Sequence, residues 1–441
     1  MISIPRAVLA LYLVLLLPSG VMAQSLSATE QKLVAEIDAR QPRALALLET
    51  AVNINSGSLN SPGVRAVGKL FSQAFEEFGM ETEWLDGAAY NRAGHLVARY
   101  GDEGPHLLLI GHLDTVFEPD SPFQKFERID DRYARGPGVT DMKGGNVIIV
   151  EALRALKQAG VLDQVTVTVM LIGDEESSGR PLGLARAALR EAADEADVAL
   201  GFEDGDGNPA TAVIARRGYT GWELEVQGMP AHSSIIFSEE IGYGAVYELA
   251  RVINGFREAL AGQVNLTLNP GIALAGTQVV FDAGNSRGSA FGKPNVIAGT
   301  ASVTGDLRTL TKEQLEEAQQ RMQDIVRTSL PGTSSQLSFA DGYPPLAPTQ
   351  GNRRLLEIWS QASQDLGFGK VEAVDPAKAG AADISFTAGR VKMALDGLGL
   401  MGKGGHTVEE TADLDTLSSQ TKRAALTIYR LNELYRDKGS F

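Results

Sequence analysis

Cysteine is absent from the 441 residues of this chain. The protein therefore has neither disulfides nor thiolate metal ligands, so any metal ion must be held by His, Asp or Glu side chains. Basic residues are also in deficit, because 40 Lys and Arg face 55 Asp and Glu, for a formal net charge of −15. This acidic balance argues against nucleic acid or an anionic membrane surface as a partner.

Long apolar runs are scarce, and the most prominent one lies at the N-terminus. Residues 1–23 carry one charge, Arg6, then an apolar run over residues 7–17 and a small-residue ending at Ala23. This order is typical of a secretory signal peptide cleaved after Ala23, and the run is too short to span a bilayer comfortably. We expect a periplasmic or secreted protein with no membrane partner after cleavage. An uncleaved membrane anchor is the alternative.

Unbroken apolar runs in the first half of the chain predict strands that are buried on both faces of a sheet. Three of these runs lead into acidic or imidazole groups: residues 107–110 into His112 and Asp114, residues 165–172 into Asp174, Glu175 and Glu176, and residues 198–202 into Glu203. Open α/β sheets place their chemistry beyond the carboxyl ends of the strands. We therefore predict an α/β domain with a mixed, mostly parallel sheet whose functional residues converge on one edge.

Helical spacing of apolar residues is found towards both ends of the chain. From about Ser27 to Val52 it predicts helical structure, with a break between two helices at Pro42. Helices are also predicted over residues 353–366 and 414–434, with His406 in a Gly-rich loop between them.

The pattern changes near residue 214 to alternating polar and apolar residues, as in 219–227 and 296–307. Alternation predicts strands with one face in water, and two amphipathic helices, about 244–261 and 312–330, lie among them. We interpret this part as an α+β domain inserted between two halves of a catalytic domain. The predicted organisation is a signal peptide (1–23), a first catalytic half (24–213), the inserted domain (214–344) and a second catalytic half (345–441).

Two imidazoles and three carboxylates are the candidate metal ligands: His112, Asp141, Glu176, Glu203 and His406. A mixed nitrogen and oxygen set suits Zn²⁺, with Co²⁺ or Mn²⁺ as substitutes. Five ligands are too many for one tetrahedral zinc that keeps a position open, so they suit two ions about 3.5–4 Å apart, bridged by one carboxylate. Any lone His-x-Asp can also be a surface histidine with a turn aspartate.

Glu175 and Glu176 form an informative pair. Adjacent side chains in an extended segment point in different directions, so one carboxylate can bind metal while the other acts on water as a general base. The alternative is an acidic helix N-terminus, which the helix dipole favours.

Three motifs together resemble the M20 metallopeptidases: Gly111-His112-Leu113-Asp114-Thr115-Val116, Gly136-Pro137-Gly138-Val139-Thr140-Asp141-Met142-Lys143-Gly144-Gly145, and Asp174-Glu175-Glu176. The resemblance covers essentially the whole mature chain and is greatest to the glutamate carboxypeptidases of the carboxypeptidase G type. It implies a zinc-peptidase-like catalytic domain with an inserted ferredoxin-like lid or dimerisation domain, assembled as a homodimer. It also implies a di-zinc carboxypeptidase that cleaves small peptides or N-acyl amino acids.

The resemblance assigns a role to each residue of the site: His112 and Glu203 on one zinc, Glu176 and His406 on the other, Asp141 bridging them, Asp114 orienting His112, and Glu175 as general base. In this family the peptide bond after the bridging aspartate is typically cis, which here is Asp141-Met142.

The inserted domain also carries matching residues. His232, in Gly228-Met229-Pro230-Ala231-His232, resembles the histidine that reaches the partner subunit's active site and stabilises the oxyanion. Outside this family it would be interpreted as a turn histidine. Asn295 and Arg308 resemble positions that contact the substrate, with Arg308 clamping the free α-carboxylate. A guanidinium fork suits a carboxylate, and a surface charge at a strand end is the alternative.

One departure concerns specificity. The lysine that would recognise a glutamate side chain falls near Thr211, and no lysine lies close by. Arg216 or Arg217 could replace it, or the specificity differs. Alternative functions are a dipeptidase, an aminoacylase or another amide hydrolase on the same scaffold. A non-catalytic metal or peptide binder is disfavoured because Glu175 and all five ligands are present.

Overall fold

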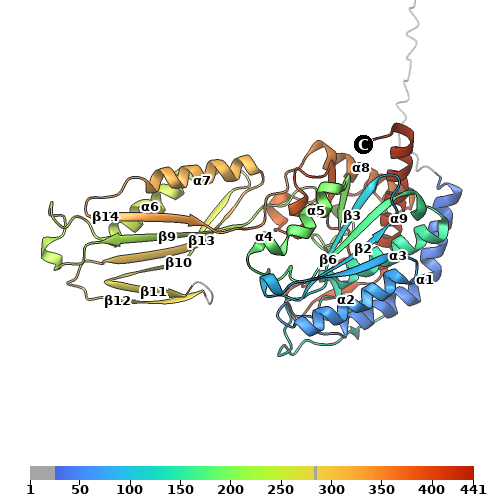
Figure 1. The fold of residues 1–441 in the computed structure, drawn as a ribbon, viewed down its shortest axis with the longest axis horizontal. Coiled ribbons are helices and arrows are strands. Elements are labelled where there is room, and N and C mark those ends of the chain that lie inside the picture. The colour runs from blue at the N-terminus through green and yellow to red at the C-terminus, as the bar shows by residue number, and fades with distance from the viewer. Residues whose placement is uncertain (1–24, 283–285) are drawn as a thin grey trace, which may run out of the picture.

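The computed structural model describes residues 25–282 and 286–441, so the predicted signal peptide lies outside the described residues. Two parts lie end to end in an elongated molecule (Figure 1): a larger α/β part, and a smaller α+β part built from residues 220–339. In the part of the chain that the structure describes, no helix has both the length and the apolarity needed to cross a bilayer.

The larger part contains a six-stranded sheet. Its strands lie in the order β1 (Glu81–Asp86), β2 (Gly94–Tyr100), β6 (Thr166–Ile172), β3 (His106–His112), β7 (Val198–Gly201) and β16 (Met393–Leu395). The pairs β6–β3, β3–β7 and β7–β16 are parallel, and the two pairs at the other edge are antiparallel. The predicted mixed, mostly parallel sheet is therefore confirmed. The three strands expected to end in functional groups are parallel neighbours, so their carboxyl ends meet at one edge.

Helices cover both faces of this sheet because its central strands are apolar on both sides. In β3, Leu107 and Leu109 pack into one buried cluster, whereas Leu108 and Ile110 pack into another on the opposite face. The first cluster lies under five helices: α1 (Ala28–Val52), α2 (Ser61–Glu76), α3 (Gly144–Ala159), α8 (Gln350–Asp365) and α9 (Asp415–Lys438). The opposite face carries α5 (Ala187–Glu195). Burial on both faces explains why alternation is missing from these strands.

Helix α1 is continuous through Pro42, so the predicted break there is wrong. Proline removes one backbone hydrogen bond and crowds the preceding turn, at a cost of about 3 kcal/mol in a helix interior. Apolar residues on both sides of it, including Ile37 and Leu48, are buried against the larger part. Packing of the whole helix outweighs the local preference for a break.

Two glycines at the start of α3 bring the ends of neighbouring segments together. A Cβ on Gly145 would lie 2.0 Å from the carbonyl oxygen of Phe202, and one on Gly144 would lie 2.5 Å from the side chain of Leu400. Only glycine permits this approach, which places the end of β7 and the loop before β17 (Gly402–Lys403) beside the Asp141 loop.

The smaller part has the ferredoxin-like arrangement that the family resemblance implies. Its elements follow one another as β9 (Thr220–Gly228), α6 (Ala245–Leu260), β10 (Thr267–Gly276), β13 (Thr300–Arg308), α7 (Lys312–Val326) and β14 (Thr333–Phe339). The strands pair antiparallel in the order β10-β13-β9-β14, and both helices lie on one side of the sheet (Figure 1). A hairpin that the sequence patterns did not indicate, β11 (Gln278–Asp282) with β12 (Arg287–Phe291), is inserted between β10 and β13.

Two antiparallel segments, residues 214–219 and 340–347, connect the parts and are called the hinge here. The amide of Arg216 donates to the carbonyl oxygen of Leu346 at 2.9 Å, and the return bond is 3.0 Å. The amide of Tyr219 donates to the carbonyl oxygen of Tyr343 at 2.9 Å. Strand β9 starts beside this hinge and runs away from the larger part (Figure 1).

Candidate metal centre

His112 ends β3 inside the larger part, where its side chain is almost fully buried. Its Nδ1 lies 3.0 Å from the backbone carbonyl oxygen of Asp114 and donates to it, which leaves Nε2 facing the neighbouring carboxylates. Burial disfavours the charged imidazolium, but the carboxylates of Glu203, Asp114 and Asp141 outweigh burial and raise the pKa of His112 well above its usual value. A metal ion at Nε2 would take the place of that proton.

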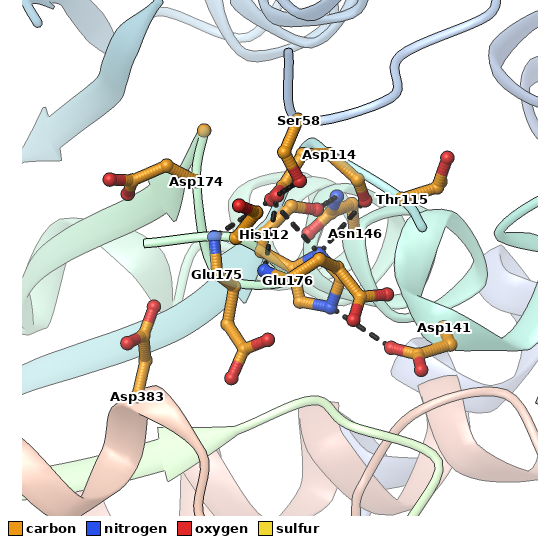
Figure 2. Close-up of polar contacts among 12 residues, drawn as sticks. Ser58, His112, Asp114, Thr115, Asp141, Asn146, Asp174, Glu175, Glu176 and Asp383 are labelled. Carbon is orange, nitrogen blue, oxygen red and sulfur yellow. Dashed lines mark hydrogen bonds and ion pairs between the residues drawn. The ribbon is translucent and has the colours of Figure 1, made fainter. Parts of the chain in front are cut away.

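Asp114 joins His112 to the acidic loop that follows β6. Its carboxylate accepts hydrogen bonds from Ser58 Oγ at 2.6 Å and from the backbone N–H groups of Glu175 and Glu176 at 3.0 and 3.1 Å (Figure 2). Burial opposes ionisation of Asp114, but the hydrogen bonds from His112, Ser58 and the Glu175 amide favour the carboxylate and lower its pKa. Asp114 therefore positions one candidate ligand and the backbone of both glutamates.

The side chains of Glu175 and Glu176 point in different directions (Figure 2). Glu176 Oε2 lies 3.1 Å from His406 Nε2, whereas the Glu175 carboxylate accepts no hydrogen bond from any described residue and is directed towards Asp383. Residues 173–181 form no helix, so the alternative of an acidic helix N-terminus is wrong. Burial, with the charge of Asp383 added to it, raises the pKa of Glu175 well above its usual value. A carboxylate with that affinity for a proton suits a general base.

The five candidate ligands form two groups that share Asp141: His112 with Asp141 and Glu203, and Asp141 with Glu176 and His406. Asp141 Oδ1 lies 3.0 Å from His112 Nε2, and Asp141 Oδ2 lies 2.9 Å from His406 Nε2. Glu203 Oε1 completes the first group at 3.7 Å from His112 Nε2. Each oxygen of one carboxylate thus faces a different imidazole.

These distances suit ligands that converge on metal ions. Two donor atoms bound to one tetrahedral zinc are about 3.4 Å apart. Burial raises the pKa of Glu176 and raises that of Glu203 well above its usual value, because each carboxylate is costly to charge in this enclosed cluster. Divalent cations would compensate this charge, and nitrogen and carboxylate donors without thiolates suit zinc, cobalt or manganese.

The loop that carries Asp141 is held by a residue that the sequence analysis did not single out, Glu410. Its carboxylate is fully buried and accepts hydrogen bonds from the backbone N–H groups of Gly138, Thr140 and Asp141 at 2.9, 2.8 and 3.1 Å. The peptide bond between Asp141 and Met142 is cis, as the family resemblance implies. Glu410 follows His406 closely in the chain, so it ties the two ligand-bearing loops together.

Glu410→Gln is expected to weaken zinc affinity about 10–100-fold, the usual effect of losing a group that orients metal ligands. Oε1 accepts from Thr140 and Asp141 and Oε2 accepts from Gly138, so an amide leaves an N–H group facing a second donor. Zinc competition titrations against a chromophoric chelator measure the change. Glu409→Gln is the matched control, because Glu409 is exposed. Equal affinities in the two variants would contradict this role for Glu410.

His406 closes the cluster from a more open side. It lies in the loop between β17 and β18 (Thr411–Asp413), with a left-handed backbone φ of 62°, and 59% of its side chain is exposed. Non-glycine residues in this conformation are uncommon and often occur at functional sites. Two carboxylates, Asp141 and Glu176, raise the pKa of His406 to about 11. Solvent, and hence a substrate, can approach the ligand groups from this side.

The three residues predicted in the inserted domain are not gathered at this cluster. Arg308 ends β13 next to the hinge, where its Nε lies 2.9 Å from Asp306 Oδ2 and its guanidinium lies over the Tyr219 ring. His232 and Asn295 lie together at the opposite end of the sheet, because the amide of Ser233 donates to the carbonyl oxygen of Asn295 at 3.0 Å. Strand β9 has nine residues, so the two ends are about 26–30 Å apart.

The arginines considered as replacements for the missing lysine have other partners. Arg216 is buried, with its Nε 2.7 Å from Asp396 Oδ2 and Nη1 2.9 Å from the carbonyl oxygen of Gly380. Arg217 lies at the hinge, with Nη2 3.0 Å from the carbonyl oxygen of Ala377. Arg216 is thus committed to the interior, and Arg217 is the more accessible of the two.

Known proteins that resemble this chain include peptidases, in agreement with the chemistry of the site. Residues 108–430 match the family described as peptidase family M20/M25/M40. Carboxypeptidase G2 of Pseudomonas sp. (strain RS-16) is 26% identical over 398 residues, which cover 89% of this chain and 90% of the relative. Among solved structures, aminopeptidase PepT from Bacillus cereus ATCC 10987 superposes with a TM-score of 0.70 at 19% identity, covering 89% of this chain and 98% of that one. The YXEP protein of Bacillus subtilis, described as a dinuclear metal-binding M20 peptidase, has a TM-score of 0.62 at 17% identity, covering 90% and 99%.

Proposed function

The chain belongs to peptidase family M20/M25/M40, and on that premise we propose that it is a di-zinc carboxypeptidase that releases a C-terminal amino acid, with glutamate preferred. The observation that carries the proposal is the pair of ligand groups sharing Asp141, with the Glu175 carboxylate beside them and free of hydrogen bonds to described residues. A metal-binding protein without activity would have no use for such a carboxylate. Carboxypeptidase G2 is the relative that supports cleavage at a C-terminal residue.

The proposed chemistry assigns the metal ions a limited part. When bound by the two ligand groups, they would supply Lewis acidity for the scissile carbonyl and for an attacking water molecule. Glu175 would take a proton from that water and deliver it to the nitrogen of the leaving amine. Burial and the charge of Asp383 raise the pKa of Glu175 well above its usual value, so it can hold this proton between the two transfers.

Recognition of the free carboxylate is assigned to Arg308. Its guanidinium presents a planar fork of donors on the sheet of the smaller part, next to the hinge, and a carboxylate can bind such a fork in bidentate fashion. Closing of the smaller part over the metal centre would bring Arg308 to the substrate. A non-hydrolysable substrate analogue should then make the molecule more compact in small-angle scattering, and an unchanged profile would refute closure.

We also propose a homodimer in which His232 acts on the partner's substrate. Within one chain His232 lies just beyond the end of β9 that is remote from the hinge, so it requires another route to a metal centre. The family resemblance supplies that route through a second subunit. His232 would donate a hydrogen bond to the oxyanion of the tetrahedral intermediate.

Export rests on residues 1–23 alone, whose order of charge, apolar run and small residues is typical of a cleaved signal. Protein recovered from the periplasm or medium should begin at Gln24. Recovery of the unprocessed chain in the membrane fraction would favour an anchor instead.

A second candidate, an amide hydrolase with another specificity such as a dipeptidase or an aminoacylase, is favoured by one observation. No lysine lies near Thr211 along the sequence, and Arg216 is engaged in an ion pair with Asp396. The recognition of a glutamate side chain therefore depends on Arg217 or on groups outside the predicted set.

The zinc-loaded mature protein should be tested on N-acyl amino acids, dipeptides and folate-type glutamate conjugates, with and without a chelator. Chelator-sensitive release of glutamate would establish the proposed activity. Release of other amino acids without cleavage of glutamyl conjugates would support the proposed mechanism but show a different substrate specificity. Absence of any turnover by the loaded protein would refute the enzyme assignment.

A further inference from the structure

A buried polar network contacts the Glu175 loop, residues 174–179. Its centre is Arg186, which has no exposed surface. Arg186 Nε lies 2.6 Å from Asp383 Oδ1, and Nη1 lies 2.6 Å from Asp174 Oδ1. Asp174 in turn accepts the amide of Gly179 at 2.7 Å, which closes the loop on itself. None of these three charged residues belongs to the two ligand groups.

The network extends to the hinge through one side chain, Tyr343. Its hydroxyl lies 2.8 Å from Arg186 Nη2, 2.9 Å from Ser178 Oγ and 3.3 Å from the backbone carbonyl oxygen of Glu175. Arg186 can only donate, so the hydroxyl accepts from it and keeps its own hydrogen for Glu175 or Ser178. The ring of Tyr343 packs against Phe386 with centroids 5.0 Å apart.

The backbone of the same residue belongs to the hinge. Its carbonyl oxygen accepts the amide of Tyr219 at 2.9 Å, where the two connecting segments pair. Tyr343 therefore contacts the segment that moves when the smaller part moves, and the residue that acts as the base. The Glu175 carboxylate accepts no hydrogen bond from any described residue, so its position depends on how its backbone is held.

We propose that Tyr343 is a positioning residue that couples the hinge to the placement of Glu175. Two anchors hold the Glu175 backbone: Asp114 accepts its N–H from the side of the ligand groups, and Tyr343 reaches its carbonyl oxygen from the hinge side. Asp114 fixes the loop to the ligands, whereas Tyr343 fixes it to the hinge. When the smaller part moves, Arg308 approaches the substrate, and the two anchors keep Glu175 in position beside the ligand groups. This inference rests on the proposed hydrolase function.

The test compares Tyr343→Phe with Tyr90→Phe. Tyr90 is also buried, and its hydroxyl lies 3.0 Å from His95 Nε2 and contacts no hinge residue among those described, so its removal deletes a buried tyrosine hydroxyl away from the hinge. Tyr343→Phe should lower kcat about 100-fold with KM changed less than about threefold, since a base misplaced by about 1 Å costs that much. Tyr90→Phe should leave both constants within about threefold of wild type.

A second readout is independent of turnover. Amide hydrogen exchange of residues 174–179 in the metal-free protein should be about tenfold faster in Tyr343→Phe, and unchanged in Tyr90→Phe, because local opening is governed by local contacts. Ser178→Ala, which removes a neighbour 2.9 Å from the Tyr343 hydroxyl, should shift exchange and kcat in the same direction by a smaller factor. Equal exchange or equal kcat in the two tyrosine variants would overturn the proposal. A wild-type protein with no turnover would refute the hydrolase function instead, and the exchange comparison would still decide the coupling.

Discussion

Glu175→Gln is expected to lower kcat by roughly 10²–10⁴-fold, the contribution usual for a positioned general base. The amide keeps the size of the side chain and cannot accept the proton of the attacking water. The ligand groups are untouched, because Glu175 belongs to neither of them. Steady-state kinetics and metal analysis of the same preparation therefore separate this effect from metal loss.

The control for that variant is its neighbour, Glu176→Gln. Glu176 belongs to the group with Asp141 and His406, so its change should reduce the amount of bound metal as well as activity. Both variants should thus lose activity, but Glu175→Gln should retain bound metal whereas Glu176→Gln should bind less of it. A Glu175→Gln variant that loses metal, or that hydrolyses at the wild-type rate, would remove the assignment of Glu175 as base.

His232→Ala is expected to lower kcat about 10²–10³-fold, as loss of one oxyanion donor does in other hydrolases. The change should leave metal content unaltered, because His232 contacts Ser234 and lies beyond the end of β9, away from both ligand groups. Kinetics on the best substrate of the panel measure the loss. Unchanged kcat would mean that the oxyanion is stabilised by another group.

Mixing two inactive variants tests whether His232 acts across a dimer. Equal amounts of His232→Ala and Glu175→Gln chains, dissociated and reassembled, should regain about a quarter of wild-type activity. Half of the random dimers are mixed, and each of these has one site with both groups. The combination of Glu175→Gln with Glu176→Gln is the control, because both lesions lie in the larger part and no mixed dimer holds an intact site. If neither mixture regains activity, His232 does not act in the partner's active site.

The clustering of the candidate metal ligands was largely predictable because these residues follow features that the sequence shows directly. His112, Glu176 and Glu203 come just after apolar runs that predict buried strands, and parallel strands bring such residues to one edge. The shared position of Asp141 came from the family motif, and the structure brings its two oxygens to different imidazoles.

The residues that the sequence did not indicate all act through contacts distant in the chain. Glu410 binds backbone amides of the Asp141 loop, and Ser58 donates to Asp114, yet neither lies in a pattern of its own. The sequence does not show which distant group a single carboxylate or hydroxyl will contact, because polar residues of these types are common in loops. The predicted helix break at Pro42 was wrong for the opposite reason. Proline is a strong local signal, but burial of both halves of α1 outweighed it.

The hairpin of β11 and β12 shows a third limit. Its strands are short and largely exposed, so alternation between a dry and a wet face has no physical basis there. The four strands of the ferredoxin-like sheet were within reach of pattern analysis, since that sheet has one face covered by helices and one face free.

The tie between Glu410 and the Asp141 loop has a consequence for the order in which the protein becomes active. The group of Asp141, Glu176 and His406 joins residues from both sides of the inserted domain, and Glu410 holds it together from near the end of the chain. A nascent chain that has emerged only as far as the smaller part holds the first ligand group and lacks His406 and Glu410. A chain that ends before His406 lacks one of the two ligand groups, so we expect peptidase activity only after almost the whole chain has been synthesised.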